Sequence, residues 1–216
     1  MTTTAPSTAS ATAAPEPVAF STWRAVGALT VGALVAGMAA AQSGAYAERY
    51  ASSCAACHGA QGVSVLPLTP SLAGQHSFYA ATQLFLFREG RRDNPVMTAV
   101  AKGMGNDDLR GFSDLIGTLP SAASAQSGPA DTATQARGAA LAAKLHCAGC
   151  HGADFAGAQQ VSRLAGQRED YLALALKGFR AASRVGYTSA MSEALAGVTP
   201  AELADLAHFM AHFKAP

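Results

Sequence analysis

Two copies of the pattern Cys-x-x-Cys-His use all four cysteines of this 216-residue chain. They are Cys54-Ala55-Ala56-Cys57-His58 and Cys147-Ala148-Gly149-Cys150-His151. In this pattern the cysteines form thioethers with the vinyl groups of a haem, and the histidine is placed to bind the iron. The sequence therefore predicts two covalently bound haem c groups. The predicted attachment residues are Cys54, Cys57, Cys147 and Cys150, and the predicted iron ligands are His58 and His151.

Cysteine pairs with this spacing also occur in zinc sites and in redox-active dithiols. A four-cysteine zinc site predicts two pairs close together in the sequence, whereas the second pair here follows the first by 93 residues. Neither alternative gives a reason for a histidine after each pair. Haem attachment explains that histidine, so zinc and dithiol sites are the weaker alternatives.

The pentapeptides belong to a longer internal repeat. The tetrapeptide Leu-Ala-Gly-Gln occurs at residues 72–75 and again, 92 residues later, at 164–167. Tyr79 has its counterpart at the same offset, Tyr171. Self-similarity at a nearly fixed offset indicates one structural unit present twice.

The repeat also selects a second ligand for each iron. Of six methionines, only Met97 and Met191 occupy equivalent positions, 39 and 40 residues after their histidines. Met104 and Met210 align with a valine and an isoleucine, which is typical of core packing. We therefore predict that Met97 and Met191 bind the irons through their thioethers.

The remaining histidines have no histidine counterpart in the other copy, and we predict solvated or capping roles for them. They are His76, His146, His208 and His212.

Together these motifs resemble the cytochrome c4 family of dihaem cytochromes. The likeness covers roughly residues 44–213. It includes Cys-x-x-Cys-His-Gly, Pro-x-Leu-Ala-Gly-Gln, Tyr-x-x-x-Gln-Leu-x-x-Phe-Arg-x-Gly, an isolated methionine and a last helix ending near Leu-Pro. The resemblance implies two tandem class I cytochrome c domains, each wrapped around one haem, that carry electrons in a bacterial periplasm.

In such folds a proline carbonyl accepts the Nδ1 proton of the iron-binding histidine, and Pro70 fits that place for His58. The second copy departs from the pattern, with Ser162 at that place and Ala175 where the first copy has Gln83. Bonds to a ligand histidine tune the metal. We therefore expect a less rigid second pocket and unequal haem potentials.

Helical patterns predominate and strand signals are nearly absent, so we predict an all-α fold. Helices are expected near residues 45–53, 78–89, 135–145 and 171–182, and the last helix of each copy is expected to begin at the caps Asn106 and Thr199. The methionine-bearing stretches are predicted to be loops. A Ser-, Gly- and Pro-containing stretch predicts a linker at 121–133 between domains at 43–120 and 134–216.

The N-terminal residues 1–42 are predicted to be a disordered leader followed by a signal peptide or membrane anchor. Arg24 precedes an uncharged run at residues 25–47 that ends its most apolar part in Met38-Ala39-Ala40-Ala41, a small-residue cleavage pattern. An uncleaved anchor through residues 25–47 is the alternative. Either segment would place the haem domains in the periplasm, soluble or tethered to the inner membrane.

The formal net charge is only +1, and the sequence shows no basic face of the kind that nucleic acid binding requires. Cations do cluster before each methionine, either as solvated helix ends or as contacts to haem propionates or a partner. The clusters are Arg88, Arg91 and Arg92, and Lys177, Arg180 and Arg184. We single out Arg88 and Arg180 as candidate propionate contacts because they match between the copies.

The sequence shows no catalytic constellation. Iron bound by histidine on one side and methionine on the other has no open position for substrate, so we predict an electron carrier rather than an enzyme. The resemblance to the cytochrome c4 family implies a quinol-oxidising complex as donor and a terminal oxidase as acceptor. Two alternatives remain: a membrane-anchored cytochrome subunit of a dehydrogenase or oxidase complex, and a dihaem peroxidase, which would need one open iron.

Overall fold

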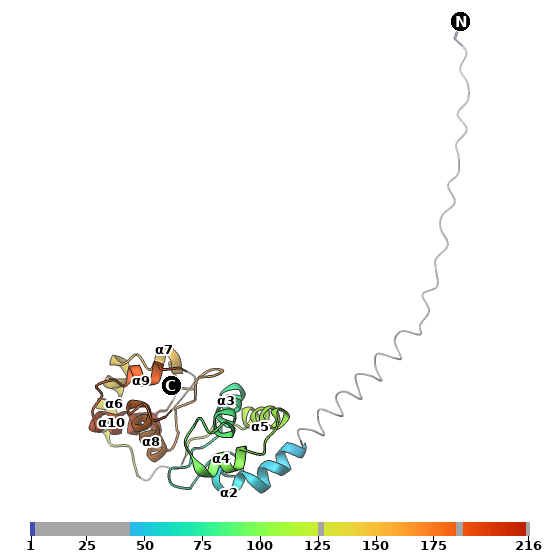
Figure 1. Ribbon diagram of the computed structural model, residues 1–216. Helices are drawn as coiled ribbons and strands as arrows, with labels where there is room; N and C mark the ends of the chain where they lie inside the picture. The colour runs from blue at the N-terminus through green and yellow to red at the C-terminus, as the bar shows by residue number, and fades with distance from the viewer. Residues whose placement is uncertain (3–43, 125–127, 185–187, 215–216) are drawn as a thin grey trace. The chain divides into compact units, whose positions relative to one another are not determined.

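The computed structural model describes residues 1–2, 44–124, 128–184 and 188–214. Its helices lie in the compact unit that extends from Ala40 to Pro216 (Figure 1). A helical segment over residues 44–53 comes first. It is followed by α2 (Ala55–His58), α3 (Ser77–Arg88), α4 (Pro95–Ala101), α5 (Asn106–Thr118), α6 (Thr132–Lys144), α7 (Ala148–His151), α8 (Glu169–Arg180), α9 (Ala190–Ala194) and α10 (Pro200–Ala211).

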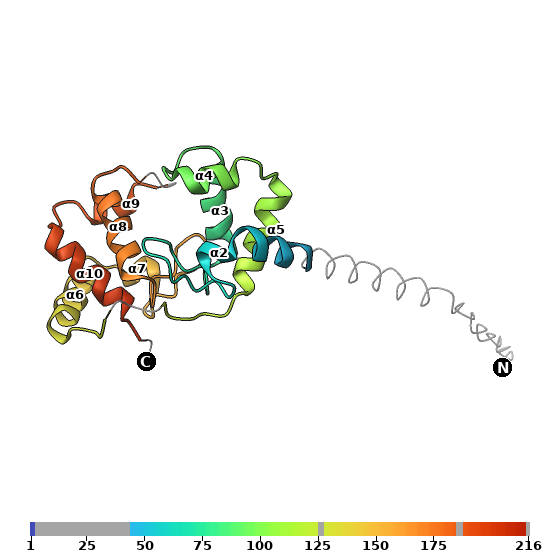
Figure 2. The same cartoon turned by 90° about the horizontal axis from the view of Figure 1, so that it is seen from below.

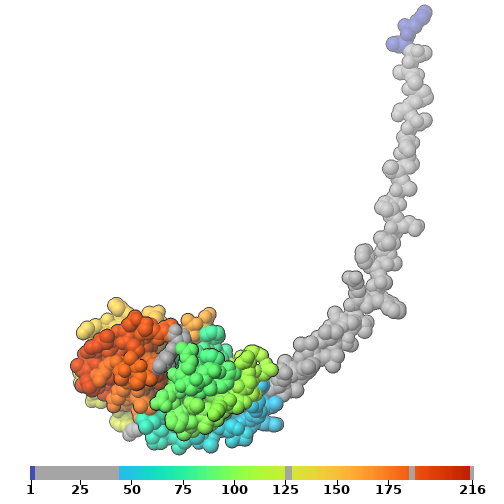
Figure 3. Space-filling view, viewed as in Figure 1, coloured from blue at the N-terminus to red at the C-terminus, as the bar shows by residue number. Residues whose placement is uncertain are grey.

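These helices form two halves with separate cores. We call the segment from residue 44 to α5 the first half and the segment from α6 to α10 the second half. In the first half α3 packs against α4 and α5, and in the second half α10 packs against α6 and α8 (Figure 2). The buried apolar residues divide in the same way, into one cluster around Phe112 and another around Leu203. The surface over α3 to α5 is drawn in green in Figure 3.

A glycine in each half lets the first helix approach the last. Gly111 of α5 lies under the ring of Tyr46, and a Cβ atom there would overlap that ring. Gly138 of α6 lies against the backbone of Asp205 in α10, where a Cβ atom would meet the Asp205 carbonyl oxygen. Both crossings depend on the absence of a side chain, because close-packed interiors do not absorb added volume without cost.

Hydrogen bonds join the two halves. His76 donates from Nε2 to the carbonyl oxygen of Ala156 at 3.1 Å, and the Tyr79 amide donates to the carbonyl oxygen of Gln159 at 3.0 Å. Ser124, at the start of the predicted linker, is buried and donates its amide proton to the carbonyl oxygen of Gly166 at 2.7 Å. This end of the linker is therefore packed against the second half.

The all-α prediction is confirmed: among the described residues the only β pairing is an isolated bridge between Ala158 and Val161. The expected helices are present with ends shifted by a few residues. Thr199 caps α10 as predicted, because its side chain accepts the amide proton of Glu202. The prediction for Asn106 was wrong by one position: Gly105 is the N-cap, and Asp108 accepts its amide proton at 3.0 Å.

The prediction that both methionines lie in loops was also wrong. Met97 lies in α4, and Met191 lies in the short helix α9. Asn94 and Pro95 explain the first case, because the asparagine caps the helix and the proline at its first position has no amide proton that needs a partner.

Residues 3–43, which include most of the predicted leader and signal peptide and the predicted anchor up to position 43, lie outside the described residues. Within the ranges that the structure describes, no helix is long and apolar enough to cross a membrane.

Candidate haem sites

The first Cys-x-x-Cys-His motif forms a single helical turn, α2. Cys54 is its N-cap, and the amides of Cys57 and His58 both donate to the carbonyl oxygen of Cys54, at 3.1 and 2.9 Å. Gly59 ends the turn with φ +83°, a conformation that residues with a side chain rarely adopt. A Cβ atom there would also clash with the Val63 carbonyl oxygen. The glycine thus lets the chain turn away directly after the histidine.

His58 is buried and oriented by the backbone. Its Nδ1–H donates to the carbonyl oxygen of Pro70 at 2.8 Å, which leaves Nε2 as the ring nitrogen that can bind a metal. Burial lowers the pKa of His58, the bond to Pro70 opposes this effect, and the positive charge of Arg92 lowers the pKa further. The imidazole is therefore kept neutral, as metal binding requires.

The second motif repeats this geometry in α7. His151 is buried, and its Nδ1–H donates to the carbonyl oxygen of Ser162 at 2.9 Å. Burial lowers the pKa of His151, and the bond to Ser162 opposes the shift. A serine carbonyl thus takes the place that Pro70 has in the first half. The backbone oxygen orients the ring in both halves, whatever the side chain of that residue.

The cysteines fit haem attachment better than the two alternatives. None of the four cysteines is in a disulfide. Burial raises the pKa of Cys54 and of Cys147, whereas a reactive dithiol requires a lowered pKa. Cys54 packs against the core of the first half and Cys147 against that of the second, so the pairs belong to different cores and do not form one four-cysteine zinc site.

Each predicted methionine is half-buried and contacts the same core as the first cysteine of its motif. Met97 and Cys54 pack against the cluster that contains Tyr50 and Leu84, and Met191 and Cys147 pack against the cluster of the second half. Asn94 fixes the start of α4 by accepting the amide proton of Met97 at 2.9 Å. The N-cap of α9, Ser189, makes no such side-chain bond.

Arg88 and Arg180 have equivalent backbone partners. Arg88 donates from Nη1 to the carbonyl oxygen of Met104 at 3.3 Å, and Arg180 donates to that of Val198 at 3.0 Å. Met104 and Val198 are themselves equivalent in the repeat. These bonds tie the ends of α3 and α8 to the segments that precede the last helix of each half. A propionate contact of either arginine stays a prediction.

Sequence reasoning missed an arginine–tyrosine cluster between the halves. The hydroxyl oxygen of Tyr171 accepts from Arg92 at 2.9 Å and from Arg184 at 3.1 Å, so these two arginines are not solvated helix ends. Burial opposes ionisation of Tyr171, but the two guanidinium groups outweigh it and lower its pKa to about 7. Burial raises the pKa of the equivalent Tyr79. The signal was present in the sequence, since Arg92 and Arg184 share the 92-residue offset of the two tyrosines.

The histidines without counterparts have structural partners. His208 donates from Nδ1 to the carboxylate of Glu169 at 3.1 Å, and its Nε2 accepts the amide proton of Asp131, the N-cap of α6, at 3.0 Å. His212 lies 3.5 Å from the same carboxylate. Glu169, His208 and His212 are close enough for a metal site. Both ring nitrogens of His208 are already engaged, which favours a structural role.

Two helical halves, each with a covalent attachment motif and an oriented, neutral histidine, define a dihaem c-type cytochrome. Comparisons with known proteins agree. Residues 135–214 match the family described as "Cytochrome c", and residues 39–112 match the family described as "Cytochrome C oxidase, cbb3-type, subunit III".

Three relatives place the chain more closely. Cytochrome c4 of Thiocapsa roseopersicina is 32% identical over 73% of this chain and 85% of the relative. The crystal structure of reduced recombinant cytochrome c4 from Pseudomonas stutzeri superposes with a TM-score of 0.72 at 26% identity, over 80% of this chain and 98% of that one. A thiosulfate dehydrogenase electron acceptor of Stutzerimonas stutzeri is 31% identical over 62% of this chain and 66% of the relative. The chain belongs to the cytochrome c4 family, and it carries two covalently bound haem c groups.

Proposed function

We propose that this protein carries single electrons between respiratory partners in the periplasm, with each iron held by a histidine and a methionine. His58 and Met97 would bind the first iron, and His151 and Met191 the second. The observation that carries this proposal is a repeated arrangement: each histidine is fixed through Nδ1, and each half contributes one matched methionine against the same core as the first cysteine of its motif.

Each haem, when bound, supplies an iron that gains or loses one electron. Residues of the protein would attach the haem, bind its iron and set its potential. The thioethers of Cys54 and Cys57, and of Cys147 and Cys150, would hold the porphyrin, and a histidine together with a methionine would keep oxygen and peroxide from the metal. A neutral thioether and a buried site would both favour the ferrous state and so raise the potential. Rigid ligands would keep the two oxidation states alike in shape.

The signal peptide or anchor predicted in the N-terminal segment would place the haem domains in the periplasm, so the donor and the acceptor must be accessible from there. We propose a quinol-oxidising complex as the donor and a terminal oxidase as the acceptor, with Arg88 and Arg180 as propionate contacts. The segment leaves the carrier either soluble or tethered to the inner membrane.

A second candidate is supported by one of the relatives, the thiosulfate dehydrogenase electron acceptor. By analogy, this protein would accept electrons directly from a dehydrogenase, as a separate acceptor or as a cytochrome subunit of that complex. The two candidates differ in the donor and not in the haem chemistry.

Stopped-flow mixing separates them. The ferric holoprotein is mixed anaerobically either with a quinol-oxidising complex and its quinol, or with a thiosulfate dehydrogenase and thiosulfate. The respiratory proposal predicts fast reduction of both haems by the first mixture and reoxidation by a terminal oxidase. Reduction by the second mixture alone would favour the dehydrogenase, and turnover of peroxide by the reduced protein would contradict both candidates.

A further inference from the structure

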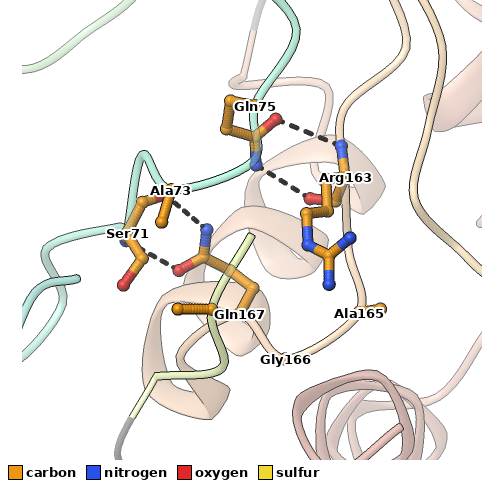
Figure 4. A pocket seen from close by; sticks show the side chains of 8 residues that line it. Ser71, Ala73, Gln75, Arg163, Ala165, Gly166 and Gln167 are labelled. Carbon is orange, nitrogen blue, oxygen red and sulfur yellow. Dashed lines mark hydrogen bonds between the residues drawn. The ribbon is translucent and has the colours of Figure 1, made fainter. Parts of the chain in front are cut away.

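Two equivalent glutamines each form a pair of hydrogen bonds with the backbone of the opposite half (Figure 4). The side-chain oxygen of Gln167 accepts the amide proton of Ser71 at 2.8 Å, and its nitrogen donates to the Ser71 carbonyl oxygen at 2.8 Å. Gln75 makes the same pair of bonds with Arg163, at 3.1 and 2.9 Å. Both glutamines are buried, with exposed fractions of 6% for Gln75 and 5% for Gln167.

In each pair, the glutamine oxygen accepts a proton from the peptide group whose carbonyl orients a histidine. The carbonyl of Pro70 and the amide N–H of Ser71 belong to one peptide group. Its oxygen accepts the Nδ1 proton of His58 at 2.8 Å, while its N–H donates to Gln167. A chain of two hydrogen bonds therefore links His58 in the first half to a side chain of the second half.

The mirror arrangement holds for the other site. The peptide group between Ser162 and Arg163 accepts the Nδ1 proton of His151 at 2.9 Å and donates its N–H to Gln75. The two chains cross, because each histidine is connected to the glutamine of the opposite half.

We propose that Gln167 is a positioning residue for the haem of the first half, and Gln75 for the haem of the second, so that each half tunes the redox equilibrium of the other. The inference rests on the proposed ligation of the irons by His58 and His151. Consecutive hydrogen bonds polarise one another, so a peptide group whose N–H is engaged has a stronger acceptor oxygen. A stronger acceptor at Nδ1–H makes the imidazole a better electron donor to the metal, which favours ferric iron.

The sign of the effect follows. Removing the glutamine oxygen weakens the acceptor at the far histidine, so that haem is reduced more easily. Gln167→Met keeps most of the side-chain volume and removes both bonds to Ser71, together with the bond that the same oxygen accepts from the Arg168 amide at 2.9 Å. In the dihaem holoprotein we expect its reduction equilibrium at the first-half haem to shift towards ferrous by about fivefold, which is about 40 mV for a one-electron couple.

The crossed pattern is the diagnostic result. Gln167→Met should alter the first-half haem and spare the second, and Gln75→Met should do the reverse. Haem signals are assigned in nuclear magnetic resonance spectra with the single variants Met97→Ala and Met191→Ala. In the diamagnetic ferrous state, Gln167→Met should also move the Nδ1–H resonance of His58 upfield and leave that of His151 in place.

His76→Leu is the matched control. It removes a hydrogen bond between the halves that belongs to neither of the two histidine–peptide–glutamine chains, so both haem potentials should stay unchanged. Equal shifts at both haems, a shift at the haem of the substituted half, or no shift would overturn the proposal. Each variant is compared only after its thioether-to-ferric charge-transfer band has been found intact at both haems, which shows that the methionine ligands are in place. A wild-type haem that lacks this band would contradict the ligation instead.

One measurement needs no variant. In the unmodified holoprotein the amide protons of Ser71 and Arg163 should exchange with solvent as slowly as those of buried helices, because each is bonded to a buried glutamine oxygen. Fast exchange of either proton would overturn the chain of bonds, whether or not the glutamine variants fold.

Discussion

At the scale of single residues, each proposed site combines one ligand held by the backbone with one held by packing. His58 and His151 are each fixed by a carbonyl oxygen, a contact that does not depend on a particular side chain. Met97 and Met191 are held by contacts with the core of their half. Substituting a methionine therefore tests the proposed ligation without disturbing the histidine.

We predict that Met97→Ala and Met191→Ala each remove about half of the thioether-to-ferric charge-transfer band at the red end of the spectrum, since each affects one of two haems. The potential of that haem should fall. The band is measured on the ferric holoprotein. Met210→Leu is the control, because Met210 is buried in the core of the second half and its replacement should leave the band intact. An unchanged band in both alanine variants would refute the ligation.

Motif spacing was sufficient to predict two haem c attachment motifs, one in each half, and the limits of the sequence are informative. The repeat also selects Met97 and Met191 as candidate ligands, because it places them at matched positions. Gln75 and Gln167 lie in the repeated Leu-Ala-Gly-Gln motif, but their partners are 88 to 96 residues away in the sequence. Such contacts depend on how the halves pack, which no local pattern encodes.

At the scale of elements, the helix that carries Met97 has a side-chain N-cap that its counterpart lacks. Asn94 caps α4, whereas Ser189 before α9 makes no side-chain cap bond. The loop prediction failed here because the Asn-Pro pair was not recognised as a helix start, although both residues favour one. The difference agrees with the expectation that the second pocket is less rigid.

We predict that Asn94→Ala loosens the attachment of Met97 and leaves Met191 unaffected. Loss of an N-cap costs about 1 kcal/mol, which corresponds to about a fivefold larger population of the open site. Cyanide added to the ferric holoprotein should therefore bind the first haem about fivefold more tightly. Asn94→Asp retains an acceptor oxygen and should bind cyanide as the unmodified protein does. Equal tightening in both variants, or tightening at the second haem, would count against the role of the cap.

At the scale of the whole molecule, two separate cores are joined by polar contacts that are buried or partly buried. Each half packs the first cysteine of its own attachment motif, Cys54 or Cys147, against its own apolar cluster. The contacts between the halves are hydrogen bonds from side chains such as His76 and Arg92, as well as the glutamine pairs. We infer that each half takes up its haem independently, while the contacts between the halves couple the haems.

We predict that the double variant Cys54→Ala, Cys57→Ala retains one covalent haem per chain and a folded second half. The reason is that the second cluster does not include residues of the first half. Intact mass and haem absorbance per chain measure the outcome, and helix content by circular dichroism reports the fold. The matched variant Cys147→Ala, Cys150→Ala should lose the other haem. Loss of both haems in either variant would show that the halves mature together.

The central claim is that both irons are bound on two faces, so that only electrons enter and leave. Exposure of the fully reduced native holoprotein to carbon monoxide tests it most directly, because carbon monoxide binds ferrous haem only where a coordination position is open. The account predicts an unchanged visible spectrum at both haems. A carbon monoxide complex at either haem of the unmodified protein would contradict it.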